Sequence, residues 1–358
     1  MIFHLTLPCV GQAIHSALRV LSKGHKMTKQ QKSIFTNPIV IVFAALLCCA
    51  LWGSATPFIK IGSAMMIPEK NVASTILFAG IRFTVAGLLT VAIYSIARRK
   101  FLIPKPESLP KILTVSAFQT VIQYIFFYVG LTNTTGVKGT IASGSSAFFC
   151  VLIASLIFKQ EKLTAKKIIA CILGFAGIVC VNLNGLELTM NFFGDGFVIL
   201  STVSYAFSSV LMKRFSKYEE PVLISGYQFI FGGAFMVIVG LAFGGGIIIP
   251  DIAAVGVLIY LSALSAVAYA LWGLLLKHNP VSKVSIFSFS TPIFGTLLSW
   301  LMLPEDSGTE PINLIITLLL VSLGIFLLNY QKSQAEPAKA EGKTASAEQN
   351  AEQPETNI

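Results

Sequence analysis

Charged side chains are scarce in this sequence: Asp, Glu, Lys and Arg together make up only 12% of its 358 residues. This share is about half of that in a typical soluble globular domain. Apolar residues make up 54% of the chain and its mean hydropathy is +0.77, so there is too little polar surface to cover a soluble protein of this size. The composition excludes a disordered chain, a collagen, a coiled coil and a disulfide-rich scaffold for the bulk of the sequence, and it predicts a polytopic membrane protein.

Side chains suited to catalysis or metal binding are equally scarce. His278 is the single histidine within residues 39–330, and no Ser/His/Asp set, HExxH motif, P-loop or acidic cluster is present. Five of the six cysteines lie inside apolar runs without a CxxC pair, which indicates buried small side chains rather than metal ligands. We therefore expect no catalytic residue, metal or cofactor, and we keep a membrane-embedded lipid-modifying enzyme as the contrasting alternative.

Ten apolar runs follow one another, each close to the ~20 residues that a helix needs to cross the hydrocarbon core. They are residues 39–59, 73–97, 112–131, 138–158, 166–184, 195–213, 222–243, 252–276, 284–303 and 312–330. The connections between them are too short to hold a soluble catalytic domain. The sequence therefore predicts an all-α transmembrane fold of ten helices in the lipid bilayer.

Lysine and arginine are distributed unevenly between the two sides of these spans. The side that carries both chain ends has 22 of them, the opposite side has three, and Arg82 lies within the second span. Since Lys and Arg are retained in cytoplasmic segments, we expect both termini on the cytoplasmic side of a bacterial-type inner membrane. The formal net charge of +10 then reflects topology, and we expect no nucleic-acid partner.

The two ends of the chain differ in composition from the spans. Residues 1–38 are mildly apolar and then basic, and Met27 is an alternative natural start that keeps a short basic lead into the first span. A signal peptide is the other interpretation, although no small-residue cleavage site follows. Residues 331–358 are rich in Ala, Glu, Gln, Lys and Thr without apolar periodicity, which predicts a disordered cytoplasmic tail.

The apolar region contains an internal duplication. Ser116 matches Ser262 and Gly87 matches Gly233, in both cases 146 positions apart. The two halves are residues 39–184 and 194–330, with five spans each. An odd number of spans makes the two copies face opposite ways in the bilayer. Inverted repeats of this kind are typical of secondary transporters, in which the substrate site lies at the membrane midplane and access to it alternates between the two sides.

Three segments carry a resemblance to a known family. They are ALWGSATPFIKIG (50–62), GVKGTIASGSSAFFCVLIASLIFKQEKLTAKKIIACILGFAGIVCV (136–181) and VSKVSIFSFSTPIFGTLLSWLMLPE (281–305). They resemble the EamA branch of the drug/metabolite transporter superfamily over both halves. The resemblance implies a ten-helix inner-membrane transporter, often an exporter of amino acids or other small metabolites. A nucleotide-sugar or organophosphate exchanger of the same superfamily is the alternative, but it would need several basic residues in its cavity, and only Arg82 qualifies.

Two stripes of identical spacing occur in the third and eighth spans. They are Ser116, Gln119, Gln123 and Phe126 in the first half, and Ser262, Ser265, Tyr269 and Trp272 in the second. Spacings of three and four place residues on one helical face, so each stripe would form one wall of a polar cavity. The alternative is hydrogen bonding between packed helices, which we favour for Ser116 and Ser262. The candidates for substrate binding are Gln119, Gln123, Tyr269 and Trp272.

Two aromatic residues and two prolines complete the candidates from the spans. Trp52 and Tyr205 occupy equivalent positions in the two halves, where they would stack on a substrate, although Trp52 is also near enough to a helix end to be an interfacial anchor. Pro57 is predicted to break the first span. Pro292 is predicted to break the ninth, whereas the fourth span has Ala147 and Phe148 at the positions equivalent to Thr291 and Pro292.

Arg82 is the strongest single candidate. Placing an arginine near the bilayer centre costs about 2.5–3.5 kcal/mol on insertion scales, and its repeat mate, Gln228, is a neutral candidate at the equivalent position. Arg82 is either a substrate or counter-ion anchor, or it joins helices through neutral partners. No Asp or Glu lies well inside a span, which favours a facilitator or exchanger over a proton antiporter. Glu161 and Glu305, at helix ends, are expected to pair with nearby lysines or to make helix-terminal contacts rather than to carry protons.

Overall fold

The computed structural model describes residues 34–69, 71–134, 136–182, 189–302 and 311–329. The predicted N-terminal segment, 1–38, lies mostly outside these residues together with Met27. The predicted tail, 331–358, lies wholly outside them, as does Glu305.

All secondary structure in the described residues is helical, and nine helical segments among them are long and apolar enough to cross a membrane. The α-helices are α3 (Pro38–Met66), α4 (Val72–Arg98), α5 (Leu109–Ser116), α6 (Gln123–Thr132), α7 (Gly136–Gly144), α8 (Ser146–Leu152), α9 (Ala165–Val181), α10 (Phe197–Phe215), α11 (Pro221–Ala242), α12 (Ile252–His278), α13 (Val281–Ser285), α14 (Ser290–Met302) and α15 (Pro311–Asn329). The predicted span 166–184 corresponds to α9, which has 17 residues and is shorter than those nine segments.

Local sequence sets several of the helix ends. The side chain of Asn71 accepts a hydrogen bond from the backbone N–H of Ser74 at 2.7 Å, and Asp251 does the same for Ala254 at 2.8 Å. These caps satisfy N–H groups that a helix start leaves without an intrahelical partner. Asn37 caps α3 directly before a proline, the residue that most readily occupies the first helical position.

Four spans of the described chain are composite rather than single α-helices, and the sixth begins with the π-helix η5 (Phe192–Gly196) directly before α10. The third contains the π-helix η2 (Ala117–Ile122) between α5 and α6, the fourth ends in the π-helix η3 (Ile153–Ile157), and the ninth contains the 3-10 helix η6 (Ile286–Phe289) between α13 and α14. Pro292 lies in the first turn of α14, directly after η6. Of the fourth and ninth spans, only the ninth was predicted to break, but the fourth is also interrupted, at Ser145 between α7 and α8.

The prediction for the first span is wrong, because α3 continues through Pro57 to Met66 without a break. Pro57 removes only the hydrogen bond that Gly53 would accept. Gly53 lies directly against α14, where an added Cβ would stand 2.6 Å from the Cβ of Phe294. The proline therefore coincides with a close helix crossing.

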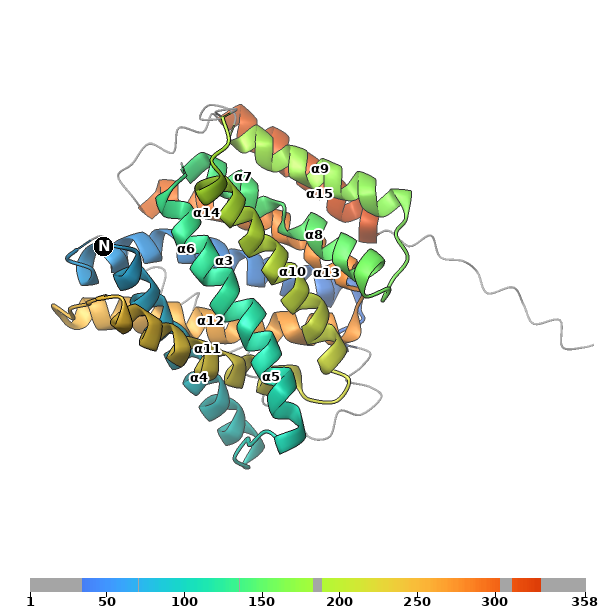
Figure 1. Cartoon of the computed structure of the whole chain (residues 1–358). Helices are drawn as coiled ribbons and strands as arrows, with labels where there is room; N and C mark the ends of the chain where they lie inside the picture. Colours follow the sequence, from blue (N-terminus) through green and yellow to red (C-terminus); the bar gives the residue numbers. More distant parts are fainter. Residues whose placement is uncertain (1–33, 70, 135, 183–188, 303–310, 330–358) are drawn as a thin grey trace, which may run out of the picture.

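The closest helix pair is α4 and α11, which pack antiparallel through glycines (Figure 1). A Cβ on Gly87 would lie 2.5 Å from the carbonyl oxygen of Gly226, and one on Gly233 would lie 2.8 Å from that of Gly80. These four glycines are two pairs of repeat mates, each 146 positions apart. Small residues allow such a close approach of transmembrane backbones.

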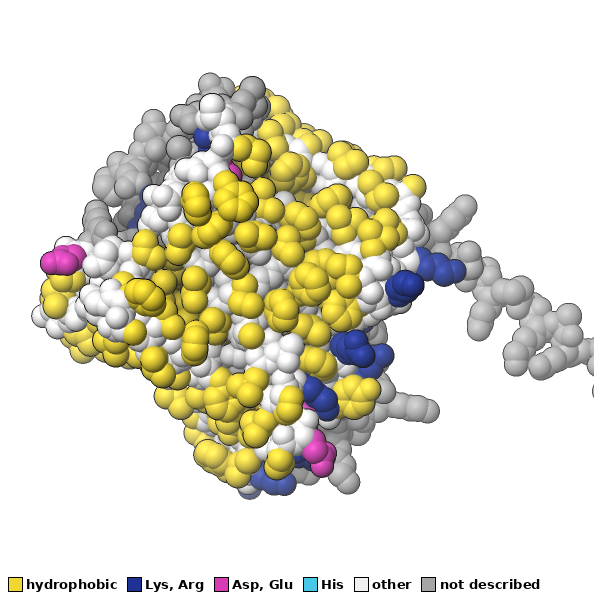
Figure 2. Space-filling view, in the orientation of Figure 1, with side chains coloured by type: hydrophobic (Ala, Val, Ile, Leu, Met, Phe, Trp, Pro, Cys, Tyr) yellow, Lys and Arg dark blue, Asp and Glu magenta, His cyan; other side chains and the backbone are white. Residues whose placement is uncertain are grey.

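The helices α9 and α15 lie side by side at one edge of the molecule (Figure 1). Hydrophobic side chains cover most of the face in Figure 2, and the lysines and arginines visible there lie mainly at its margins. An apolar surface of this extent between charged margins is what a hydrocarbon environment requires. The protein is a multi-pass membrane protein.

Candidate functional site

Arg82 is buried inside the helix bundle, with 3% of its surface exposed. Its guanidinium carbon lies 4.4 Å from the centroid of the Phe83 ring, an attractive cation–π distance. The Nε atom has no hydrogen-bond partner, and no carboxylate among the described residues pairs with the side chain. The charge therefore lies in a buried, mainly aromatic environment.

Six aromatic side chains form a connected group near Arg82, which we call the central aromatic cluster. Its members are Trp52 of α3, Phe83 of α4, Tyr124 of α6, Phe229 of α11, and Tyr269 and Trp272 of α12. The Trp52 ring meets Trp272 at 4.9 Å and Tyr269 at 5.2 Å, both edge to face. The hydroxyls of Tyr124 and Tyr269 are 2.9 Å apart and share a hydrogen bond. Both halves of the chain thus contribute rings to one cluster.

Phe83, whose ring lies against the Arg82 guanidinium, is a member of this cluster and contacts the rings of Tyr124 and Phe229. The arginine thus belongs to the same site as the central aromatic cluster. A cation with aromatic walls is suited to a molecule that has an anionic group and an apolar body.

Buried polar atoms without a hydrogen-bond partner are numerous among the sequence-predicted candidates. They are Nε1 of Trp52 and Trp272, Oε1 of Gln119 and Gln123, Nε2 of Gln228, and the hydroxyl of Tyr205. Each such group costs about 1–3 kcal/mol when it stays unsatisfied, so their concentration calls for an explanation. Hydrogen bonds from these groups to a bound substrate would explain it.

A reciprocal pair of hydrogen bonds joins the two halves beside Arg82. The hydroxyl of Ser116 donates to the backbone carbonyl of Gln228 at 2.8 Å, and the hydroxyl of Ser262 donates to that of Arg82 at 3.0 Å. Donors and acceptors are both repeat mates, 146 positions apart. The two serines therefore join helices, as we expected for them. The side chain of Gln228 also accepts a bond from Thr120 at 2.6 Å.

The stripe predicted for the third span does not follow one regular face. It crosses the π-helix η2, whose turns hold more residues than α-helical turns. Phe126 contacts Phe197 of α10 at 5.0 Å, whereas Tyr124, which was not predicted, reaches Tyr269. Gln119 and Gln123 are at least partly buried but make no ring contact with the central aromatic cluster.

Phe83 and Phe229 were also missed by the sequence analysis. They are repeat mates, and their rings stack at 5.1 Å with an interplanar angle of 8°. A signal was present, because the two aligned segments 78–83 and 224–229 both end in phenylalanine. Phenylalanine is so frequent in this chain, at 27 residues, that the match did not stand out.

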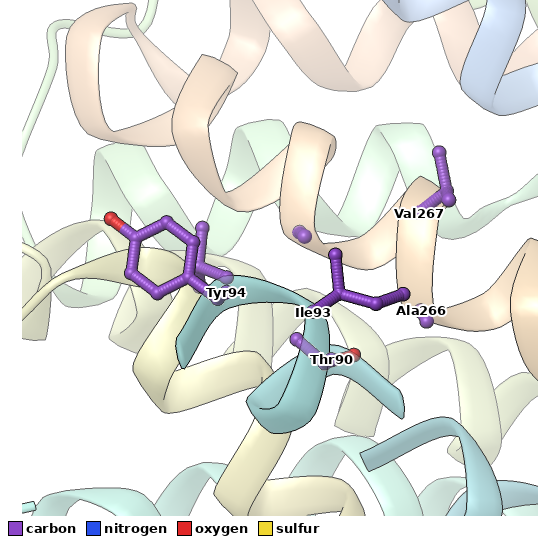
Figure 3. A pocket seen from close by; sticks show the side chains of 7 residues that line it. Thr90, Ile93, Tyr94, Ala266 and Val267 are labelled. Carbon is purple, nitrogen blue, oxygen red and sulfur yellow. The ribbon is translucent and has the colours of Figure 1, made fainter. Parts of the chain in front are cut away.

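The candidate residues line neither of the two best-defined pockets of the described chain. One pocket, of about 20 Å³, lies between Thr90, Ile93, Tyr94, Ala266 and Val267 and has room for about one water (Figure 3). The other, of about 360 Å³, has an apolar lining and lies between the N-terminal end of α4 and the C-terminal end of α11.

The described residues contain no group of three or more His, Cys, Asp or Glu side chains that could hold a metal ion. The chemistry available at the site is therefore binding through one cation, aromatic rings, amides and hydroxyls.

The model of the EamA-like transporter family matches the chain twice, over residues 39–183 and again over 192–330. The protein belongs to the EamA-like transporter family. Two similar relatives are an uncharacterized transporter of Archaeoglobus fulgidus, 25% identical over 72% of this chain and 88% of its own, and the uncharacterized transporter YvbV of Bacillus subtilis, 26% identical over 84% and 94%. A WAT1-related chloroplastic protein of Arabidopsis thaliana is 25% identical over 77% of this chain and 68% of its own.

The fold of this EamA-like transporter also has a counterpart among solved structures. A crystal structure with 17% sequence identity covers 82% of this chain and 97% of the matched chain, with a TM-score of 0.64. At this identity the likeness concerns the fold alone. The names of the relatives agree with a membrane transporter of the drug/metabolite superfamily.

Proposed function

We propose that this EamA-like transporter exports a small, amino-acid-like metabolite that bears a carboxylate across a bacterial-type inner membrane. Transport proceeds by alternating access between two inverted five-helix repeats, residues 39–184 and 194–330, and both termini are cytoplasmic. The direction of transport follows from the resemblance to exporters. Substrate and lipid bilayer are the expected partners, and the site uses no cofactor.

Equivalent contacts made by repeat mates support the inverted arrangement. Besides the serine bonds, Asn133 and Asn279 each donate a side-chain hydrogen bond to the carbonyl four residues earlier, at 2.8 and 3.0 Å. Asn182 and Asn329 do the same at the ends of α9 and α15. With five spans per half, such mates lie on opposite faces of the membrane, which is the symmetry that alternating access uses.

The observation that carries the proposal is Arg82, a buried cation in an aromatic site without a carboxylate partner among the described residues. A buried charge is expensive unless it is compensated, and a substrate carboxylate compensates it. Among the described lysines and arginines, Arg82 is the one that is buried. A single guanidinium matches one carboxylate and is poorly suited to a pyrophosphate, so the organophosphate exchanger ranks second.

Replacement of Arg82 tests the proposal. Arg82→Gln should insert normally but reduce transport of carboxylate-bearing substrates by about 10- to 100-fold, the effect of losing a hydrogen bond to a charged group. Arg82→Lys should keep part of the activity, because it retains the charge. Efflux of a pool of amino acids and nucleobases from loaded vesicles is the measurement.

Arg98→Gln is the matched control, because Arg98 lies in the last turn of the same helix and pairs with Glu220 at 2.9 Å. It should transport at nearly the wild-type rate. Wild-type efflux by Arg82→Gln would show that Arg82 does not anchor the substrate. Misfolding of Arg82→Gln, read from thermal unfolding in detergent, would assign Arg82 to helix packing instead.

A further inference from the structure

A second group of buried polar side chains lies apart from the central aromatic cluster. It consists of Cys150 on α8, Tyr205 and Ser209 on α10, and Ser285 on α13, and we call it the inner polar cluster. The three helices that carry these residues all pack against one another. All four residues are more than nine-tenths buried.

The serines of this cluster differ from other buried serines on the same helix. Ser201 and Ser208 each donate to the carbonyl three residues earlier, at 2.7 Å, which satisfies the hydroxyl within the helix. The hydroxyls of Ser209, Ser285 and Tyr205 have no such partner. Buried hydroxyls that have no hydrogen-bond partner within the chain are available to another molecule.

The inner polar cluster extends from the central site toward one face of the membrane. At one end, α10 packs against α6, which carries Tyr124. At the other end, Ser209 directly precedes Val210, whose carbonyl accepts a hydrogen bond from Gln160, and Ser285 lies one turn after Ser282, which bonds to Glu161. Positive-inside counting places Glu161 on the cytoplasmic side. The polar groups therefore form a series from the centre of the molecule to its cytoplasmic surface.

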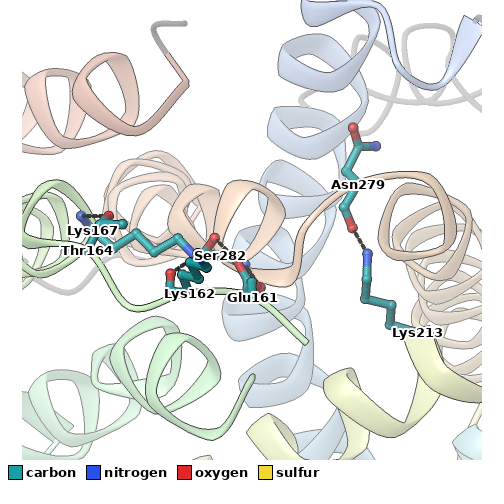
Figure 4. Close-up of polar contacts among 7 residues, drawn as sticks. All are labelled: Glu161, Lys162, Thr164, Lys167, Lys213, Asn279 and Ser282. Carbon is teal, nitrogen blue, oxygen red and sulfur yellow. Dashed lines mark hydrogen bonds and ion pairs between the residues drawn. The ribbon is translucent and has the colours of Figure 1, made fainter. Parts of the chain in front are cut away.

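Glu161, at this end of the series, lies close to Ser282 of α13 (Figure 4). Its carboxylate accepts hydrogen bonds from Lys167 at 2.6 Å, from the backbone N–H of Ser282 at 3.0 Å, and from the Ser282 hydroxyl. Burial raises the pKa of Glu161, but the bonds from Lys167 and Ser282 outweigh it and hold the pKa below its ordinary value. The contact joins the first half of the chain to the first turn of α13 in the second half.

The connection that contains Glu161 contacts two helices, α10 on one side and α13 on the other. The side-chain amide of Gln160 donates to the carbonyl of Val210 on α10 at 3.2 Å. On the other side, α13 has five residues and continues into the 3-10 helix η6. A short helix that continues into a different helical geometry is suited to move as a unit.

We propose that the inner polar cluster is the cytoplasmic section of the translocation path, and that the Glu161–Ser282 contact is the latch that closes it. This inference rests on the proposed function, because a path presupposes transport. When the latch opens, α13 separates from α8 and α10, and the hydroxyls of the cluster become accessible to the polar groups of a substrate from the cytoplasm.

Cys150 is a natural reporter of this opening. In a variant whose other cysteines are replaced by serine or alanine, a membrane-impermeant thiol reagent is applied to inside-out vesicles and to intact spheroplasts. Glu161→Gln and Ser282→Ala should each raise the rate of Cys150 labelling in inside-out vesicles about tenfold, the effect of losing a hydrogen bond to a charged group. Neither should permit labelling from the outer side.

Glu220→Gln is the matched control, since Glu220 also joins the two halves on that side, through Arg98 and Tyr94. It should leave Cys150 labelling unchanged. Equal labelling in all variants, or labelling from the outer side, would overturn the latch. The labelling assay needs no substrate, so the latch and the Arg82 anchor are tested separately. Faster Cys150 labelling together with normal transport by Arg82→Gln supports the latch and rejects the anchor. Unchanged labelling together with reduced transport by Arg82→Gln supports the anchor and rejects the latch.

Discussion

At the residue scale, the charges of Arg82 and Glu161 are compensated in opposite ways. Glu161 receives three hydrogen bonds from Lys167 and Ser282, as a buried carboxylate normally requires. Its pairing with a nearby lysine was predicted and is confirmed. Arg82 has a phenylalanine ring and no carboxylate among the described residues. In the proposed function the substrate carboxylate supplies the partner of Arg82, whereas Glu161 already has its partners within the chain.

The contribution of Glu161 to stability should depend on pH in a defined direction. Because its pKa lies below the ordinary 4.5, the charged form is favoured in the folded protein. The stabilisation is complete above that value and is lost as the pH falls below it. The difference in Tm between the wild type and Glu161→Gln, measured in detergent, should be constant between about pH 8 and 6 and should shrink below about pH 4.5. A difference that grows on acidification would contradict this assignment.

At the element scale, close helix contacts and departures from α-helical geometry position the site. The glycine contacts between α4 and α11 bring Phe83 and Phe229 into stacking distance. The π-helix η2 alters the rotation of α6 relative to α5, and Tyr124 on α6 reaches Tyr269. Uniform helices with larger side chains at these contacts would not bring the same rings together.

Gly87→Ala tests the importance of the α4–α11 contact. The added Cβ would lie 2.5 Å from the carbonyl oxygen of Gly226 and 2.7 Å from the backbone nitrogen of Ile230, and a backbone cannot rotate away as a side chain can. We expect a loss of about 1–3 kcal/mol of unfolding free energy, typical of overpacking, measured by denaturation in detergent.

Gly256→Ala is the control for this substitution, since it lies within α12 and its Cβ would meet nothing within 4 Å. It should be neutral or stabilising by up to about 1 kcal/mol, the gain in helix propensity. Equal effects of the two substitutions would mean that propensity, and not helix contact, governs the result.

At the scale of the whole molecule, repeat mates make matching contacts in pairs. Ser116 and Ser262 bond across the two halves to carbonyls of residues that are themselves mates, and the family model matches each half separately. Arg82 and Gln228 are the exception in charge, because one mate is cationic and the other neutral. Two matching repeats with a positive charge in only one of them suit a substrate whose two ends differ in charge.

The proposed topology is open to a direct test. Alkaline phosphatase is active only outside the cytoplasm, so its fusion after residue 330 should give low activity, and fusion in the connection between α3 and α4 should give high activity. The uneven distribution of lysine and arginine is the physical reason. High activity after residue 330 would contradict the cytoplasmic placement of the C-terminus.

The sequence by itself determined the membrane class, the approximate spans, the duplication and the placement of Arg82 inside a span. These depend on the length, hydropathy and charge of contiguous segments, which are local properties. It did not determine that Tyr124 rather than Gln123 reaches Tyr269, that the chain is interrupted at Ser145 without a proline, or that Glu161 bonds to Ser282, 121 positions away. Those contacts depend on how each helix is rotated and how closely it approaches its neighbours, and only the packing of the whole bundle fixes both.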